Sequence, residues 1–84
     1  MIPDDFSERA KEILREQVMK ARQIKVHSIV LLWISPFGEL SHRCGFFEDF
    51  DEATRFANYL DESCKKANGD DVKCSVYMDG FLYK

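Results

Sequence analysis

The longest apolar run in the sequence extends only from Ile29 to Ile34. This run is far shorter than the roughly 20 residues that a membrane-spanning helix needs. It is typical of a central strand buried on both faces, because a strand with one solvated face alternates apolar and polar residues. Such alternation begins at Ile24 and leads into the run, so we expect one strand from Ile24 to Ile34.

Two segments show the apolar spacing of three and four residues that is typical of amphipathic helices. They cover about residues 5–22 and 50–67. Asp5 and Asp49 each lie three residues before a glutamate, which is the capping-box pattern of a helix N-terminus. Gly69 follows the second segment, and glycine favours the left-handed conformation that ends many helices. We therefore predict two helices with these bounds.

Three further strands are expected near residues 39–47, 71–78 and 81–84. The segment from Ser35 to Gly38 has the composition of a turn, with proline at its second position. The dipeptide Asp79-Gly80 is favoured in two-residue hairpin turns. Within the strand at 39–47, Gly45 indicates either a bulge or a close approach to the backbone.

The element order α-β-β-α-β-(β) indicates an α+β fold in a single domain that spans residues 1–84. We expect both helices to pack on one face of a three- or four-stranded, mostly antiparallel sheet, which would bury their apolar stripes. The strands at 39–47 and 71–78 are joined by the second helix, as in a crossover between parallel strands. The order of the strands in the sheet stays open.

The formal net charge is −3, and residues 48–84 hold nine Asp and Glu against five Lys and Arg. Because no basic stripe runs along the chain, we expect no direct contact with nucleic acid. A polybasic membrane anchor is missing for the same reason. Three cysteines cannot form a complete set of intrachain disulfides, and the N-terminus lacks a signal-peptide pattern. We therefore expect reduced thiols and a cytoplasmic protein.

One set of side chains has the composition of a tetrahedral zinc shell, namely His42, Cys44, Cys64 and Cys74. No C-x₂-C pair is present, however, and free cysteines commonly fill apolar cores. His42 and Cys44 could alternatively form a base and a thiol nucleophile, although no third residue is placed to orient the histidine. We expect no metal and no other cofactor, and the buried-thiol interpretation is favoured.

Surplus aromatic residues and an acidic second helix indicate a surface that binds another protein. Tyrosine is enriched at binding hot spots, and an unpaired sheet edge at the C-terminal hairpin could pair with another chain or with a second copy. A second minor core would be the alternative fate of these aromatics. The predicted partner-binding residues are Asp51, Asp61, Glu62, Tyr59, Tyr77, Phe81 and Tyr83.

The sequence contains no nucleotide-binding motif and no recognisable catalytic motif. We therefore expect a non-enzymatic, stoichiometric protein-binding module, such as an adaptor, regulator or inhibitor, as small acidic accessory proteins of viruses and mobile elements often are. One alternative is a homo-oligomeric domain that binds or senses a small ligand. The other is a zinc-binding or thiol-dependent protein that uses the cysteine and histidine residues named above.

Overall fold

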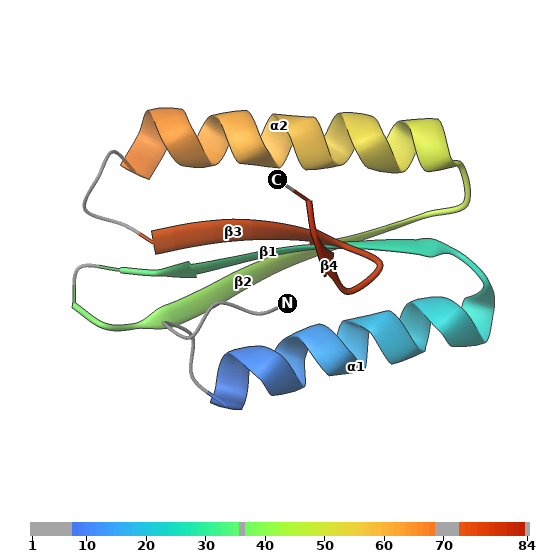
Figure 1. Ribbon diagram of the computed structural model, residues 1–84, viewed down its shortest axis with the longest axis horizontal. Helices are drawn as coiled ribbons and strands as arrows, with labels where there is room; N and C mark the ends of the chain where they lie inside the picture. The colour runs from blue at the N-terminus through green and yellow to red at the C-terminus, as the bar shows by residue number, and fades with distance from the viewer. Residues whose placement is uncertain (1–7, 36, 69–72, 84) are drawn as a thin grey trace.

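The computed structural model describes residues 8–35, 37–68 and 73–83. It contains two helices and a four-stranded antiparallel sheet, so the predicted α+β class and element order are confirmed (Figure 1). Asp5, Gly69 and residue 84 lie outside the described residues. The elements are α1 (Glu8–Ile24), β1 (His27–Ile34), β2 (Leu40–Phe47), α2 (Phe50–Asn68), β3 (Lys73–Met78) and β4 (Phe81–Leu82).

The strand order in the sheet is β2-β1-β3-β4, and every neighbouring pair is antiparallel. The apolar strand β1 is therefore central, and its residues 28–32 are buried, as the six-residue run predicts. Since β2 and β3 are both antiparallel to β1, they are parallel to each other with β1 between them. The helix α2 thus connects two parallel strands that are not neighbours.

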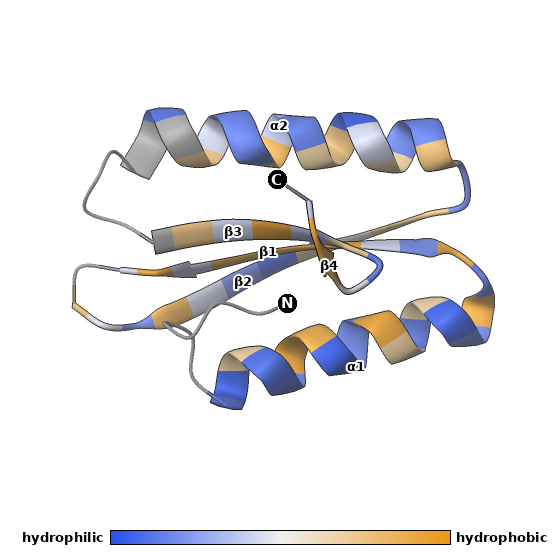
Figure 2. Cartoon of the chain, viewed as in Figure 1, coloured by the Kyte–Doolittle hydropathy of each residue, from blue (hydrophilic) through white to orange (hydrophobic). Residues whose placement is uncertain are grey.

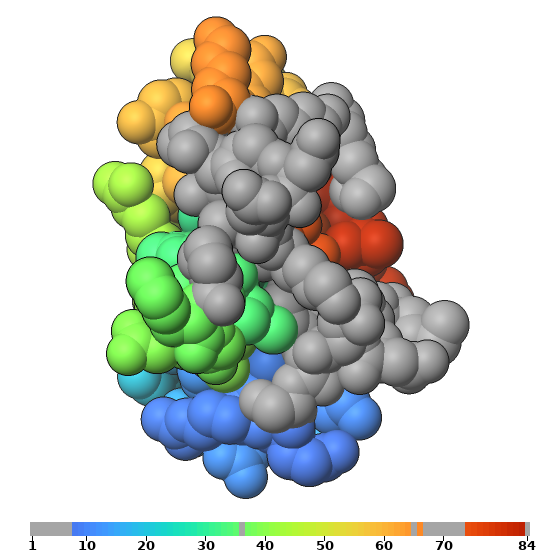
Figure 3. Space-filling view, turned by 90° about the vertical axis from the view of Figure 1, so that its left-hand side faces the viewer, coloured from blue at the N-terminus to red at the C-terminus, as the bar shows by residue number. Residues whose placement is uncertain are grey.

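The two helices cover opposite faces of the sheet, so the prediction that both pack on one face is wrong (Figures 1 and 3). Helix α1 packs Ile13 and Leu14 against Val30 and Leu32 of β1. Helix α2 packs Ala57, Leu60 and other apolar residues against Ile29 and Leu31 of the same strand. The physical reason is that side chains alternate between the two faces along β1. Its consecutive apolar residues therefore point to both faces, and each face must be packed against a helix.

Each helix directs its apolar side toward the sheet and its polar side outward (Figure 2). The described residues contain no helix with an apolar stretch long enough to cross a bilayer. Helix α1 continues to Ile24, two residues beyond the predicted end. Lys25 then adopts a left-handed conformation with φ 58°, and the Val26 amide donates to the Ala21 carbonyl at 2.9 Å, which closes the last turn. The strand prediction that began at Ile24 is therefore wrong by three residues, because alternating residues also fit the end of a helix.

Local signals at the other joints are confirmed. The Asp51 amide donates to Oδ1 of Asp49 at 3.1 Å, so Asp49 caps α2 as predicted. Asp79 and Gly80 both have positive φ angles, 52° and 90°, as the expected two-residue hairpin turn requires. Gly45 marks a close approach and not a bulge, because a Cβ there would lie 2.8 Å from Cε2 of Phe56 while the β1–β2 register continues without a break.

Candidate functional site

The sheet separates the four residues of the candidate zinc shell into two pairs. His42 and Cys44 lie opposite Leu32 and Val30 of β1, and directly opposed residues share one face of a sheet. This places both on the α1 side, whereas Cys64 and Cys74 lie in the core on the α2 side. The described residues hold no group of three or more His, Cys, Asp or Glu side chains that could bind one metal ion.

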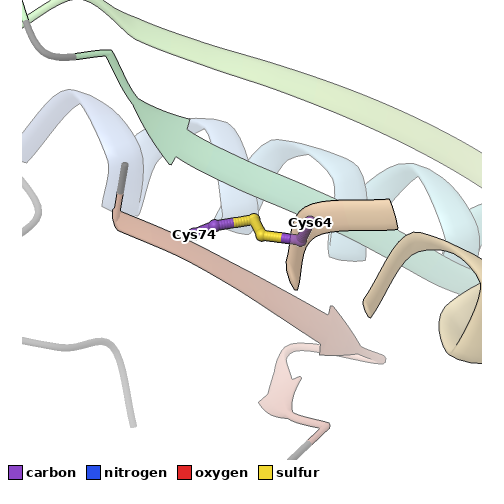
Figure 4. Close-up of a disulfide and its surroundings, with 2 residues drawn as sticks. All are labelled: Cys64 and Cys74. Carbon is purple, nitrogen blue, oxygen red and sulfur yellow. A yellow bond between two sulfur atoms is a disulfide. The ribbon is translucent and has the colours of Figure 1, made fainter. Parts of the chain in front are cut away.

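Cys64 of α2 and Cys74 of β3 form a disulfide, with their Cα atoms 6.4 Å apart (Figure 4). The prediction of three reduced thiols is therefore wrong for this pair. An odd cysteine count excludes only a complete pairing and leaves room for one bridge beside one free thiol, Cys44. The disulfide also removes the composition-based reason for expecting a reducing compartment.

Cys44 has the wrong electrostatics for a nucleophile. Burial raises the pKa of its thiol, and the positive charge of Lys20 offsets this only in part. A reactive cysteine needs the opposite shift, because the thiolate is the attacking species. Its proposed base, His42, is exposed on the edge strand. Cys44 is half-buried and packs against the core on the α1 side, so the structure supports the buried-thiol interpretation only in part.

The four aromatic residues that were predicted to contact a partner differ in how far they are exposed. Tyr77 is 0% exposed and lies in the core beneath α1, so its assignment to a partner-binding surface is wrong. The alternation of side chains along β3 explains the error, because Tyr77 lies directly opposite Val30 of β1 and points to the same buried face of the sheet. Tyr83 packs against the α2 core, and its hydroxyl donates to Oδ1 of Asn58 at 2.7 Å. Tyr59 and Phe81 are exposed, at 56% and 71%.

The acidic residues of α2 do not form a uniformly negative face. Asp51 and Glu62 are exposed and Asp61 is half-buried, but Arg55 and Lys66 are exposed on the same helix. The described outer surface of α2 therefore has mixed charge.

A shallow groove of about 230 Å³ lies between α2 and the β1–β2 side of the sheet. Two partly exposed aromatic side chains, Trp33 of β1 and Tyr59 of α2, line it together with Arg43 of β2. Its other lining residues are Leu31, Leu60, Ser63 and Cys64. The early part of α2 lies over Gly45 of β2, whereas its later part is joined through Cys64 to β3, so Arg43 is left uncovered beside the helix.

Arg43 is the residue of this groove that sequence reasoning missed. It is exposed and forms no ion pair with a carboxylate in the described part of the chain. The signal available in the sequence was that Arg43 is the one charged residue in the strand Leu40–Phe47. That signal could not locate Arg43 beside Tyr59, because the two residues belong to elements whose packing the sequence leaves open.

The two exposed aromatics among the predicted contact residues, Tyr59 and Phe81, lie on separate flanks of α2. Tyr59 lies on the β2 flank with Arg43, whereas Asn58 contacts Tyr83, which directly follows β4 at the opposite edge of the sheet. Phe81 and Tyr59 are thus not parts of one patch. We take the groove at Tyr59 as the candidate site, because it combines a cavity, aromatic walls and a charged group.

Comparison with known proteins gives no relative: this chain matches no family model, no curated protein and no solved structure.

Proposed function

We propose that this chain is a non-enzymatic protein-binding module that acts by stoichiometric contact, as an adaptor, regulator or inhibitor. The observation that carries the proposal is the groove in which Tyr59, 56% exposed, stands beside Trp33 and Arg43. Tyrosine, tryptophan and arginine are the residues most enriched at the energetic centres of protein interfaces.

The dimensions of the groove favour a side chain of a protein over a free small molecule. Its volume of about 230 Å³ is below the roughly 300–1,000 Å³ of typical small-molecule sites. A single apolar side chain of a partner would fill it. The guanidinium of Arg43 at its rim, which forms no ion pair within the described part of the chain, suits a neighbouring carboxylate, which arginine binds through two parallel hydrogen bonds. We therefore propose a partner segment with an apolar residue next to an acidic one.

The acidic residues Asp51, Asp61 and Glu62 have a secondary role in this proposal. Charges at the rim of an interface mainly change the rate of association and its salt dependence. They would guide a partner whose remaining surface is basic, while the groove supplies most of the affinity. Phe81, on the other flank of α2, would belong to a second contact.

The test is an affinity pull-down from lysate of the native host, in which the unmodified protein is compared with the variant Tyr59→Ala. We expect one protein to be retained in stoichiometric amount and to be lost from the variant, because truncation of a hot-spot residue costs about 2 kcal/mol or more. This loss corresponds to roughly a 30-fold weaker Kd.

Met19→Ala is the matched control, since Met19 is 55% exposed and lies on α1, on the opposite side of the molecule. It should retain the partner at the level of the unmodified protein. The proposal is refuted if no protein is retained above background, and the groove assignment is refuted if both variants lose the partner equally.

A further inference from the structure

The strand β2 forms one edge of the sheet along its entire length. It pairs with β1 through residues 40–47, and on its outer side no strand of the described chain pairs with it. His42 and Arg43 in its middle are both exposed, so neither helix covers this part of the edge. At the other edge, the two-residue strand β4 already covers the end of β3. The long open edge is thus β2 and not the C-terminal hairpin.

The hydrogen-bond pattern shows which backbone groups of β2 point outward. The Ser35 amide donates to the Glu39 carbonyl at 2.9 Å, so these residues form a hydrogen-bonded pair at the turn. Such pairs alternate along an antiparallel ladder. The odd-numbered residues of β2 therefore bond to β1, and the even-numbered ones direct N–H and C=O groups outward. These residues are Leu40, His42, Cys44 and Phe46.

The opposite side of β1 gives the same assignment independently. The Asp79 amide donates to the Ser28 carbonyl at 2.9 Å, which makes this a hydrogen-bonded pair between β1 and β3. Even-numbered residues of β1 thus bond to β3, and odd-numbered ones are left for β2. The row of outward groups on β2 is consequently a regular one, ready to pair with another strand.

Symmetry restricts how two copies of β2 could pair. An antiparallel pair about a two-fold axis must match outward residues with outward residues. A register centred on Arg43 would place two arginines directly opposite each other, which is unfavourable. A register centred on His42 would pair only residues 40–44. A register centred on Cys44 pairs residues 41–47 and opposes no like charges.

The register centred on Cys44 also accommodates the side chains of β2. Arg43 then lies opposite the partner's Gly45, which has no side chain. In each copy the rings of Phe47 and Phe56 lie directly over Gly45. The guanidinium of Arg43 would therefore meet an aromatic surface, which attracts cations. Cys44 meets its symmetry mate on the α1 side of the sheet.

We propose that two copies of this chain associate through β2, antiparallel and about a two-fold axis at Cys44, so that the two four-stranded sheets become continuous. The occupant of this edge is thus a second copy of the chain. This inference does not rest on the proposed function, but the two share Arg43, whose guanidinium cannot bind a carboxylate at the groove and lie on the aromatic rings of the second copy at the same time.

Cys44 makes the register directly testable, because it is the cysteine that takes no part in the Cys64–Cys74 disulfide. Opposed residues of a hydrogen-bonded pair have Cα atoms about 5.5 Å apart, which is within the range of about 4.4–6.8 Å for disulfides. Diamide would oxidise the two Cys44 thiols to a disulfide and accept their two electrons and two protons. Mildly alkaline pH is suitable, because burial raises the pKa of this thiol.

We expect the purified protein to sediment at twice the monomer mass and to give a reducible, covalent dimer with diamide. Cys44→Ser should remain dimeric by sedimentation but lose the covalent product. The same variant with the added change His42→Cys should also stay uncrosslinked, because position 42 faces the partner's Phe46. A monomer at every accessible concentration would overturn the proposal, and so would crosslinking through position 42 in place of Cys44.

Discussion

At the scale of single residues, Tyr77 is completely buried, yet its hydroxyl lacks a well-formed hydrogen bond. Its side chain is 0% exposed among apolar residues of α1 and β1, and its hydroxyl makes no well-formed hydrogen bond in the described part of the chain, although the side chain of Ser75 lies near enough to lower its pKa in part. A buried hydroxyl without a partner lowers stability, since it loses its hydrogen bonds to water on folding. The aromatic ring, in contrast, stabilises the core by removing apolar surface from water.

We predict that Tyr77→Phe is at least as stable as the unmodified protein at neutral pH and more stable at alkaline pH. Burial raises the pKa of Tyr77, so the folded state holds its proton more firmly than the unfolded state does. The stability from this residue is complete below the ordinary tyrosine pKa of about 10 and is lost as the pH rises toward the folded-state value.

Urea unfolding of both proteins at neutral pH and above pH ~10 checks this prediction. The difference in unfolding free energy should grow in favour of the phenylalanine variant as the pH rises. A loss of more than about 1 kcal/mol in the variant at neutral pH would show that the hydroxyl has a hydrogen-bond partner.

At the scale of elements, the alternation of hydrogen bonds along β2 distinguishes two neighbouring residues. The amide of His42 points outward, and that of Arg43 points to β1. We predict that His42→Pro leaves the folded monomer nearly as stable as before, because proline there removes no bond to β1. Arg43→Pro should destabilise the monomer by about 1–3 kcal/mol, since it leaves a carbonyl of β1 unpaired.

Chemical unfolding in dilute solution measures both variants, and each serves as the control for the other because both add one proline to the same strand. Equal destabilisation by the two substitutions would contradict the assignment of outward and inward residues. His42→Pro should additionally prevent the sedimentation change expected for pairing through β2.

Sequence periodicity was sufficient to predict the elements but not their assembly. It indicates which stripe of each helix is apolar, and capping and turn residues such as Asp49 and Asp79-Gly80 locate the joints correctly. The face of the sheet that each helix covers depends on strand order, which the pattern leaves open. Even so, the unbroken run from Ile29 to Ile34 requires cover on both faces, and this already argued against two helices on one side.

The candidate site was less predictable than the fold, for the same physical reason. Tyr59 was recognised from its residue type, but Arg43 became relevant only once α2 was placed over β2. Tyr77 was misassigned because its orientation depends on its pairing with Val30 in the register between β1 and β3. Residue chemistry is visible in the sequence, whereas contacts between distant elements depend on the tertiary packing.

At the scale of the whole molecule, the Cys64–Cys74 disulfide links the later part of α2 to β3, which follows it in the chain. The sequence separation of 10 residues predicts a stabilisation of about 2–3 kcal/mol from the reduced entropy of the unfolded chain. In a domain of this size, such a change shifts Tm by roughly 8–24 °C. We predict that a thiol reductant lowers Tm by this amount.

Thermal unfolding monitored by circular dichroism, with and without dithiothreitol, measures the shift. The double variant Cys64→Ser, Cys74→Ser should match the reduced protein and not respond to reductant. Cys44→Ser should respond like the unmodified protein, because Cys44 is not bridged. An unchanged Tm after complete reduction would show that the bridge contributes nothing to stability.

The position of the sheet between α1 and α2 has a consequence for mutational robustness. The two helices bury separate sets of residues, and no described part of α1 lies against α2. Effects of substitutions at sites that share no partner add to within about 0.5 kcal/mol. A truncation at Leu14 and one at Leu60 should therefore be tolerated or rejected independently. In evolution or in protein engineering, the sequence of either helix could therefore change while that of the other stays the same.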